Sequence, residues 1–155
     1  SKTYSMPGWR LGYALVPEAL AERLTVLLVH AVGCTADFTQ VAGMVALEGD
    51  QAQPERMRAE YKERRDKTVA ALNEVPGVTC DLPQGAFYVF PDVRSFSRPS
   101  REIADFLLDD AGVALLPGTD FGDGGEGFLR ISYATAWERI EQGVERIKAG
   151  LATLA

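Results

Sequence analysis

The chain has 155 residues, of which 46% are hydrophobic, 25% charged and 9% aromatic. This composition excludes collagen-like and disordered classes, and the formal net charge of −6 argues against nucleic acid or an anionic membrane as the main partner. No run reaches the ~18 apolar residues of a membrane helix. The single histidine, His30, excludes a multi-histidine site, so we expect no metal ion. The two separated cysteines, Cys34 and Cys80, indicate a reduced, cytoplasmic protein.

The first third of the chain is predicted to hold one short strand and two helices. The apolar run 11–16 ends at Pro17 and predicts a strand. Pro17 suits the first turn of a helix, and residues 37–47 predict a second helix whose small side chains favour close packing. One face of the first helix is predicted to be a buried stripe of Leu20, Leu24, Leu27 and Leu28.

The rest of the chain is predicted to form a long helix and then an α+β unit. The long helix covers 54–74, and its residues 60–67 mix both charges, which favours a solvent-exposed face over a nucleic-acid site. Strands are predicted at 78–80, 86–90, 113–116 and 128–133. Helices are predicted at 101–110, capped by Ser100, and after a capping box at 135–138. The last helix buries one stripe, with Ile140, Val144, Ile147, Leu151 and Leu154. Helices on one face of a small, largely antiparallel sheet are the simplest arrangement.

Two basic residues near the start of the chain are candidates for binding a phosphorylated aldehyde. Lys2 offers a primary amine, which forms imines with aldehydes. Arg10 follows eight residues later between Gly8 and Gly12, where small residues allow an anion to approach, and a guanidinium is a preferred partner of phosphate. An amine and a phosphate-binding guanidinium on one segment indicate a cofactor of this chemical class.

Arg130 is the third candidate. It lies in the middle of a predicted strand, between Leu129 and Ile131, where an unpaired charge costs free energy. From the residues alone, a cross-strand ion pair and a site for a substrate carboxylate are both open.

The segment Ser1-Lys2-Thr3-Tyr4-Ser5-Met6-Pro7-Gly8-Trp9-Arg10-Leu11-Gly12-Tyr13 resembles the cofactor-attachment motif of class I/II aminotransferases, the aspartate aminotransferase family of pyridoxal-phosphate fold type I. Residues 84–92, 113–122 and 128–134 resemble the C-terminal domain of that family, in the same order. The resemblance covers essentially the whole chain. It implies an α/β fold: the end of the large domain, followed by a small α+β domain with helices on a largely antiparallel sheet.

The resemblance also implies the roles of the three basic residues. Lys2 matches the lysine that holds pyridoxal 5'-phosphate as an aldimine and later moves a proton at the substrate's Cα. Arg10 matches the arginine that binds the cofactor phosphate, and Arg130 matches the arginine that binds the substrate α-carboxylate. The implied activity is transfer of an amino group between an L-amino acid and a 2-oxo acid, by a homodimer. Residues 30–37 contain no Arg or Lys, so the sequence does not favour dicarboxylic substrates.

The expected organisation is the end of a large cofactor-binding domain at 1–50, a connecting helix at 51–75 and a small domain at 76–155. A chain that opens at this motif is expected to be the C-terminal portion of an enzyme and inactive alone. The apolar strand at 11–16 would then pair with the missing half or with a second copy. Two other functions stay open: a lyase of the same fold, and a stand-alone non-catalytic module.

Overall fold

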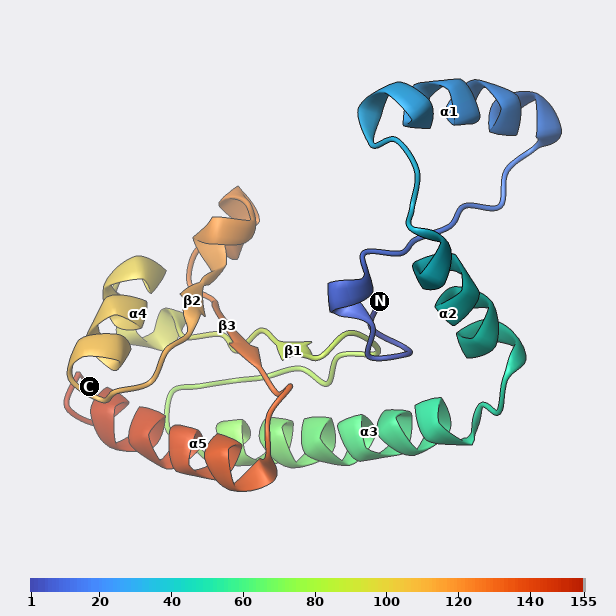
Figure 1. The fold of residues 1–155 in the computed structure, drawn as a ribbon. Helices are drawn as coiled ribbons and strands as arrows, with labels where there is room; N and C mark the ends of the chain where they lie inside the picture. Colours follow the sequence, from blue (N-terminus) through green and yellow to red (C-terminus); the bar gives the residue numbers. More distant parts are fainter. Residues whose placement is uncertain (155) are drawn as a thin grey trace. The chain divides into compact units, whose positions relative to one another are not determined.

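The computed structural model describes residues 1–154, which divide into two compact units (Figure 1). Unit 1 is Ser1–Arg58, and unit 2 begins at Ala59. The boundary lies inside the long helix α3 (Ala52–Asn73), within the first third of the segment 51–75 that we expect to connect two domains. The two units are described separately below.

Unit 1 consists of a folded N-terminal segment, two helices and the first turns of α3. A 3-10 turn at Pro7–Trp9 precedes α1 (Glu18–Ala31) and α2 (Asp37–Glu48), so both predicted helices are confirmed. The predicted strand at 11–16 is wrong, because this run is extended but forms no ladder within residues 1–154. The described part of unit 1 has no second strand that could supply the paired N–H and C=O groups.

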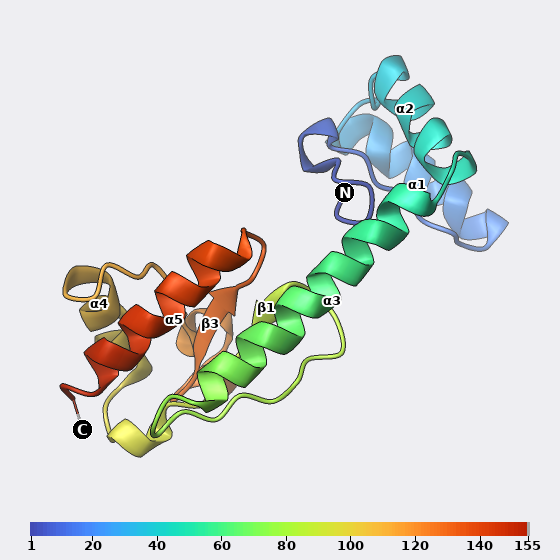
Figure 2. The ribbon, with the colours of Figure 1, turned by 90° about the horizontal axis from the view of Figure 1, so that it is seen from below.

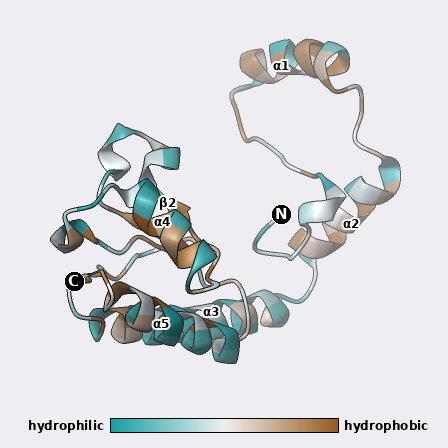
Figure 3. Cartoon of the chain, turned by 90° about the vertical axis from the view of Figure 1, so that its left-hand side faces the viewer, coloured by the Kyte–Doolittle hydropathy of each residue, from teal (hydrophilic) through white to brown (hydrophobic). Residues whose placement is uncertain are grey.

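The predicted burial of the α1 stripe is also wrong. None of the residues of α1 is buried, and Leu20, Leu27 and Leu28 are 45%, 60% and 50% exposed. In Figure 3, α1 is coloured mostly as hydrophobic. A helical repeat of leucines identifies an apolar face but does not show what covers it. Among residues 1–154, no helix combines the length and apolar character needed to cross a bilayer.

Small side chains in α2 allow the preceding segment to come close, as predicted. A Cβ atom at Gly43 would overlap the end of the Leu11 side chain, so in this arrangement Leu11 packs directly on the backbone of α2. The Trp9 and Phe38 rings meet edge to face with their centroids 6.4 Å apart. The N-terminal segment is thereby attached to the start and middle of α2.

Unit 2 contains a three-stranded antiparallel sheet in the order β1-β3-β2. The strands are β1 (Tyr88–Val89), β2 (Leu116–Pro117) and β3 (Leu129–Ser132), and the predicted antiparallel sheet is confirmed. Val89 pairs with Ile131, and Leu116 pairs with Arg130. β1 and β3 are shorter than predicted, and β2 shares only Leu116 with the strand predicted at 113–116. The segment 78–80 forms only an isolated bridge between Thr79 and Asp92. Prolines at 91 and 117 shorten the ladders, since proline has no N–H to donate.

Helices cover one face of this sheet. Helix α5 (Trp137–Leu151) and the later turns of α3 lie on the same side of the strands, as the two views in Figures 1 and 2 show. Helix α4 (Ser100–Asp109) contacts both β2 and α5. The core of unit 2 includes Leu72, Val89, Ile103, Leu107, Leu129 and the predicted α5 stripe from Ile140 to Leu151, which is confirmed. Leu154, the last residue of the predicted stripe, lies beyond the end of α5 and is only partly buried against this core.

Most of the charged stretch of α3 faces solvent, as predicted, although the Arg65 side chain is only 17% exposed. Ion pairs of opposite charge link successive turns, with Lys62–Asp66 at 2.7 Å and Lys67–Glu63 at 2.6 Å. All four of these side chains are at least 40% exposed. Pairs with this spacing add only about 0.2–0.5 kcal/mol each, so they give α3 solubility more than stability.

The two predicted helix caps are wrong, although both helices form. Helix α4 begins at Ser100 itself, one residue earlier than expected, and the buried Ser100 hydroxyl has no hydrogen-bond partner within the described residues. Helix α5 begins at Trp137 with Ala136 as its N-cap, so Thr135 lies one position too early to cap it. A shift of one residue is enough to remove a cap, because the capping side chain reaches only the first-turn N–H groups.

A pair of neighbouring leucines in α4 provides a test of this core. Leu107 is 0% exposed, whereas Leu108 is 51% exposed. We expect Leu107→Ala to lower the free energy of unfolding by about 2–5 kcal/mol, because it leaves a cavity in a closed core. Leu108→Ala should change it by no more than about 0.5 kcal/mol. Chemical denaturation of both variants measures the difference, and equal losses would contradict the assigned orientation of α4.

Candidate functional site

Lys2 lies in a tight turn at the start of unit 1. The Met6 N–H donates to the Ser1 carbonyl at 2.8 Å, and the Ser5 N–H donates to the Lys2 carbonyl at 3.2 Å. The Tyr4 hydroxyl donates to Gln51 Oε1 at 3.1 Å, which ties this turn to the residue preceding α3. The Lys2 side chain is exposed and makes no ion pair among the described residues. The amine is therefore presented on an ordered backbone with no carboxylate to neutralise it.

Arg10 ends the same folded segment. Its backbone is left-handed, with φ at +53°, and its guanidinium donates to the Pro7 carbonyl at 2.8 Å. This φ is unusual for a residue with a side chain, and such residues cluster at functional sites. A Cβ atom added at Gly8 or Gly12 would meet nothing within 4 Å, so both glycines border open space. The guanidinium is exposed and pairs with no carboxylate of the described chain, so its remaining N–H groups are available to an anion.

The groups on this segment fit a phosphorylated aldehyde. Lys2 supplies a primary amine and Arg10 a guanidinium, and they lie at the two ends of one ten-residue structure in unit 1. An amine reacts with a carbonyl, and a guanidinium binds phosphate with paired N–H donors. Lys2 and Arg10 therefore suit the aldehyde and the phosphate of such a cofactor, respectively.

Arg130 belongs to unit 2 and lies on the sheet face opposite to the helices. Its neighbours in β3 and β1, Leu129 and Val89, are both 1% exposed and point into the core. Because side chains alternate along a strand, Arg130 and Tyr88 share the other face. The cross-strand ion pair is wrong, since the residue opposite Arg130 is Leu116 and its guanidinium makes no salt bridge within residues 1–154.

Two aromatic rings hold the Arg130 guanidinium. Its central carbon lies 3.6 Å from the centroid of the Phe121 ring and 4.3 Å from that of Tyr88. Tyr88 packs on Phe87, and Phe121 packs on Phe90, so the two rings make contact with the cation rather than with each other. The charge is thus stabilised by ring faces and retains its N–H groups for a ligand.

The loop that carries Phe121 is closed by backbone contact between two glycines. Phe121 ends a 3-10 turn, Gly118–Phe121, and a second turn follows at Asp123–Gly125. A Cβ atom at Gly118 would collide with the carbonyl of Gly125, and one at Gly125 would collide with the backbone of Gly118. The Gly118 N–H donates to the Phe128 carbonyl at 2.7 Å, and Asp120 pairs with Arg101 of α4. The loop is therefore fixed at both ends.

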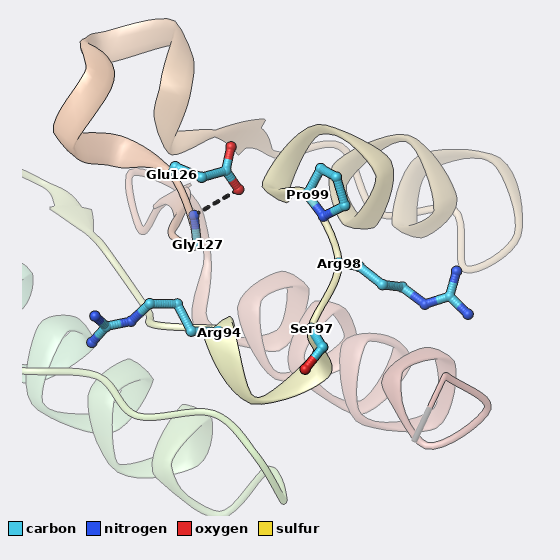
Figure 4. Close-up of a pocket in the computed structure, with 6 residues that line it drawn as sticks. All are labelled: Arg94, Ser97, Arg98, Pro99, Glu126 and Gly127. Atoms are coloured by element: carbon cyan, nitrogen blue, oxygen red, sulfur yellow. Dashed lines mark hydrogen bonds between the residues drawn. The ribbon is translucent and has the colours of Figure 1, made fainter.

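Two hollows lie in the described surface. The larger, in unit 1, lies between α1, α2 and the N-terminal segment, which contributes Ser1, Tyr4, Met6 and residues 11–13, and no charged side chain lines it. The other, in unit 2, is drawn in Figure 4 and is lined by Arg94, Arg98 and Glu126 among others. In Figure 4 the two arginine side chains point away from one another, so they do not converge on one anion. Neither hollow contains Lys2, Arg10 or Arg130.

In the second hollow, the carboxylate of Glu126 itself occupies the position at the start of α4 where an anion could bind. Its Oε1 accepts the Ser100 N–H at the start of α4 at 2.8 Å and the Gly127 N–H at 2.9 Å. These backbone hydrogen bonds lower the pKa of the Glu126 carboxyl below its ordinary value. No sequence pattern predicts this role, because Glu126 lies 26 residues away from the helix start that it caps.

Glu126→Gln is expected to destabilise the chain in a pH-dependent way. Since the folded state lowers the pKa of this carboxyl, its stabilising effect is present above the unfolded-state value of about 4.3 and is lost as the pH falls through the folded-state value. The difference in midpoint of thermal unfolding between wild type and variant should therefore shrink from pH 7 toward pH 3. A difference that is constant over this range would show that the charged form makes no special contact.

Neither cysteine is a candidate nucleophile from its surroundings. Cys80 lies in the core of unit 2, and burial raises the pKa of its thiol to about 11. A protonated thiol in an apolar core is inert, since the thiolate is the reactive form. Cys34 is exposed and its thiol contacts the Thr35 carbonyl at 3.3 Å, without a basic residue beside it.

Comparison with known proteins identifies the family. The model of the family "aminotransferase class I and II" matches residues 1–147. The chain belongs to this family. It is 40% identical over 153 residues to an aspartate aminotransferase of Pyrococcus horikoshii, a match that covers 97% of this chain and 39% of the relative. It is 38% identical over 150 residues to aromatic-amino-acid aminotransferase 2 of Thermococcus litoralis, covering 96% of this chain and 38% of the relative.

Solved structures show the same fold. The crystal structure of an aromatic aminotransferase from Pyrococcus horikoshii superimposes with a TM-score of 0.94 at 39% identity, over 100% of this chain and 42% of that one. An aspartate aminotransferase from Rhizobium meliloti gives a TM-score of 0.92 at 35% identity, over 97% and 40%. The chain thus has the fold of the C-terminal part of an aminotransferase of fold type I, and spans about 40% of the length of these relatives.

Proposed function

We propose that this chain provides the catalytic lysine, a phosphate-binding arginine and the carboxylate-binding arginine of a pyridoxal-phosphate-dependent aminotransferase. Class I and II aminotransferases use this cofactor. The observation that carries the proposal is the N-terminal segment of unit 1, which presents Lys2 and Arg10 on one ordered structure without a carboxylate partner for either. The activity is that of a protein of full family length that contains these residues.

Lys2 would hold the cofactor through its amine and act on the substrate at one atom. Pyridoxal 5'-phosphate, when bound, withdraws electrons from the substrate's Cα and so makes its C–H bond acidic. The Lys2 Nζ would act as the base that takes this proton from Cα and would hold it for return to the reacting molecule. One amine would both hold the cofactor and move the proton, because the turn at 1–6 fixes the backbone from which the Lys2 side chain extends.

Arg10 and Arg130 would orient the two reactants. The Arg10 guanidinium binds the cofactor phosphate, and the open space at Gly8 and Gly12 leaves room for it. The Arg130 guanidinium binds the α-carboxylate shared by amino acids and 2-oxo acids, using the N–H groups that no protein carboxylate occupies. A carboxylate held at a fixed position limits the orientations that the substrate can adopt.

The product separates transamination from elimination. An aminotransferase with these residues converts an L-amino acid and a 2-oxo acid into a new pair of the same two classes, without free ammonia. A lyase with the same fold releases ammonia from a single amino acid, since the same lysine and arginines serve either reaction. Incubation of the full-length protein with both substrates, with assay of keto acid and ammonia, tests the proposal. Ammonia release in equal amount to substrate loss would overturn it, and absence of any reaction would favour a non-catalytic module.

We also propose the wider organisation that the family suggests. Residues 1–50 would complete the large cofactor-binding domain, 51–75 would connect the domains, and 76–155 would form the small domain. The enzyme would act as a homodimer, as the family suggests, in the cytoplasm, where the two free cysteines would stay reduced. These proposals are tested by the size of the purified protein in solution and by limited proteolysis at the predicted boundaries.

A further inference from the structure

The contact between Arg130 and Phe121 has a geometry that restricts the guanidinium. At 3.6 Å from its central carbon to the ring centroid, the planar group can only lie flat on the ring, because an edge-on approach would overlap the atoms. The Tyr88 ring stands 4.3 Å away from the same carbon. With rings packed on the cation, its N–H groups point outward in the plane of the guanidinium, where a carboxylate binds in a bidentate way.

Phe121 lies in a loop, at the end of the 3-10 turn Gly118–Phe121, and not in the sheet that contains Arg130. The backbone approach of Gly118 to Gly125 and the Asp120–Arg101 ion pair fix this loop, yet the Phe121 ring is 48% exposed. An apolar ring that is exposed to this degree contributes little to the core, so its burial does not explain its position. The position of the Phe121 ring is explained by its packing on the Arg130 guanidinium.

We propose that Phe121 is a positioning residue for the carboxylate-binding arginine. This inference rests on the proposed function, in which Arg130 binds the substrate α-carboxylate. Phe121 limits the rotamers of Arg130 before substrate arrives and excludes water from one face of the guanidinium. Both effects strengthen the hydrogen bonds that form at its edge, because less freedom is lost on binding and the surroundings are less polar. The ring itself does not contact the reacting atoms.

The test compares variants of Phe121 in the full-length enzyme. Phe121→Leu and Phe121→Met should raise KM for both the amino acid and the 2-oxo acid about 3–30-fold, the range expected for loss of a partly desolvated cation–π contact, and leave kcat unchanged. Phe121→Tyr, which keeps the ring, should restore KM to the wild-type value. The inhibition constant of a simple carboxylate, propionate, should rise by the same factor as KM.

Phe128→Leu is the matched control. Phe128 is also an aromatic ring beside an arginine in unit 2, with the Arg94 guanidinium carbon 5.2 Å from its centroid. Its replacement removes a cation–π contact of the same kind from an arginine to which we assign no role in binding. KM should then stay at the wild-type value, and a rise equal to that in Phe121→Leu would overturn the proposal.

Arg130→Ala separates failure of this inference from failure of the proposed function. If Arg130→Ala leaves KM unchanged, the proposed carboxylate site is wrong and the inference falls with it. If Arg130→Ala raises KM but neither Phe121→Leu nor Phe121→Met does, the site stands and the positioning role is overturned. In the Arg130→Ala background, Phe121→Leu should have no further effect on KM, whereas an additive effect would show that Phe121 acts elsewhere.

Discussion

Replacement of Lys2 by alanine is expected to abolish transamination in the full-length protein. General acid–base catalysis by one positioned side chain contributes about 10²–10⁴-fold to a rate, and the loss of the group that holds the cofactor adds to this figure. We therefore expect kcat to fall by at least about 10³-fold. Single-turnover kinetics with a saturating amino acid, followed by the absorbance of the cofactor, measures this directly.

Lys148→Ala is the control for Lys2→Ala. Lys148 lies in the last turn of α5, is exposed like Lys2, and makes no ion pair among residues 1–154. Its removal should leave kcat within twofold of wild type, since a lone surface charge contributes little. If Lys2→Ala retained kcat to a similar degree, the assignment of the catalytic lysine would be wrong.

Arg130→Ala is expected to weaken the binding of both substrates more than any other single change in unit 2. Removal of one partner of a hydrogen-bonded charge pair in a water-excluded site costs about 2–5 kcal/mol. This corresponds to a rise in KM of about 30- to 5,000-fold. The content of bound cofactor after dialysis should stay close to that of the wild type, because Arg130 has no role in holding the phosphate.

Arg10→Ala should give the opposite pattern. It removes N–H donors to the phosphate, so we expect cofactor to be lost on dialysis and activity to be restored by added cofactor. KM for the amino acid should change little once the cofactor is present in excess. Equal loss of cofactor in Arg10→Ala and Arg130→Ala would contradict the separation of roles between the two arginines.

The sequence predicted the helices well because their periodicity is a local property. The stripe of α5, from Ile140 to Leu151, is buried as its spacing of three and four residues requires. Helix α1 has a comparable leucine pattern, yet Leu27 stays 60% exposed. The apolar run at 11–16 likewise predicted a strand that does not form. In both segments the apolar pattern was read correctly. Burial of a helix face and pairing of a strand depend on neighbouring elements, which the pattern does not specify.

Of the candidate site, only the charged residues could be predicted from the sequence, and not the side chains that surround them. Lys2, Arg10 and Arg130 were predicted from their residue types, their flanking residues and the resemblance to a family motif, and their roles stay predictions. The contacts of Tyr88 and Phe121 with Arg130 were not predicted. Tyr88 lies 42 residues before Arg130 and reaches it across the sheet, and Phe121 lies 9 residues before it in a loop. Glu126 was missed for the same reason, since it caps a helix 26 residues earlier in the chain. Long-range contacts of single side chains have no periodic signature.

The contact between Gly118 and Gly125 sets how this loop tolerates change over evolution. Each glycine forbids a side chain on the other, since a Cβ on either one overlaps the opposite backbone. No compensating substitution at the second position can relieve an alanine at the first, because glycine already has the smallest side chain. Gly124, beside them, has open space around its missing Cβ and carries no such restriction. Substitutions at Gly118 or Gly125 are therefore expected to displace the loop and with it the Phe121 ring over Arg130, whereas a substitution at Gly124 is expected to leave the ring in place.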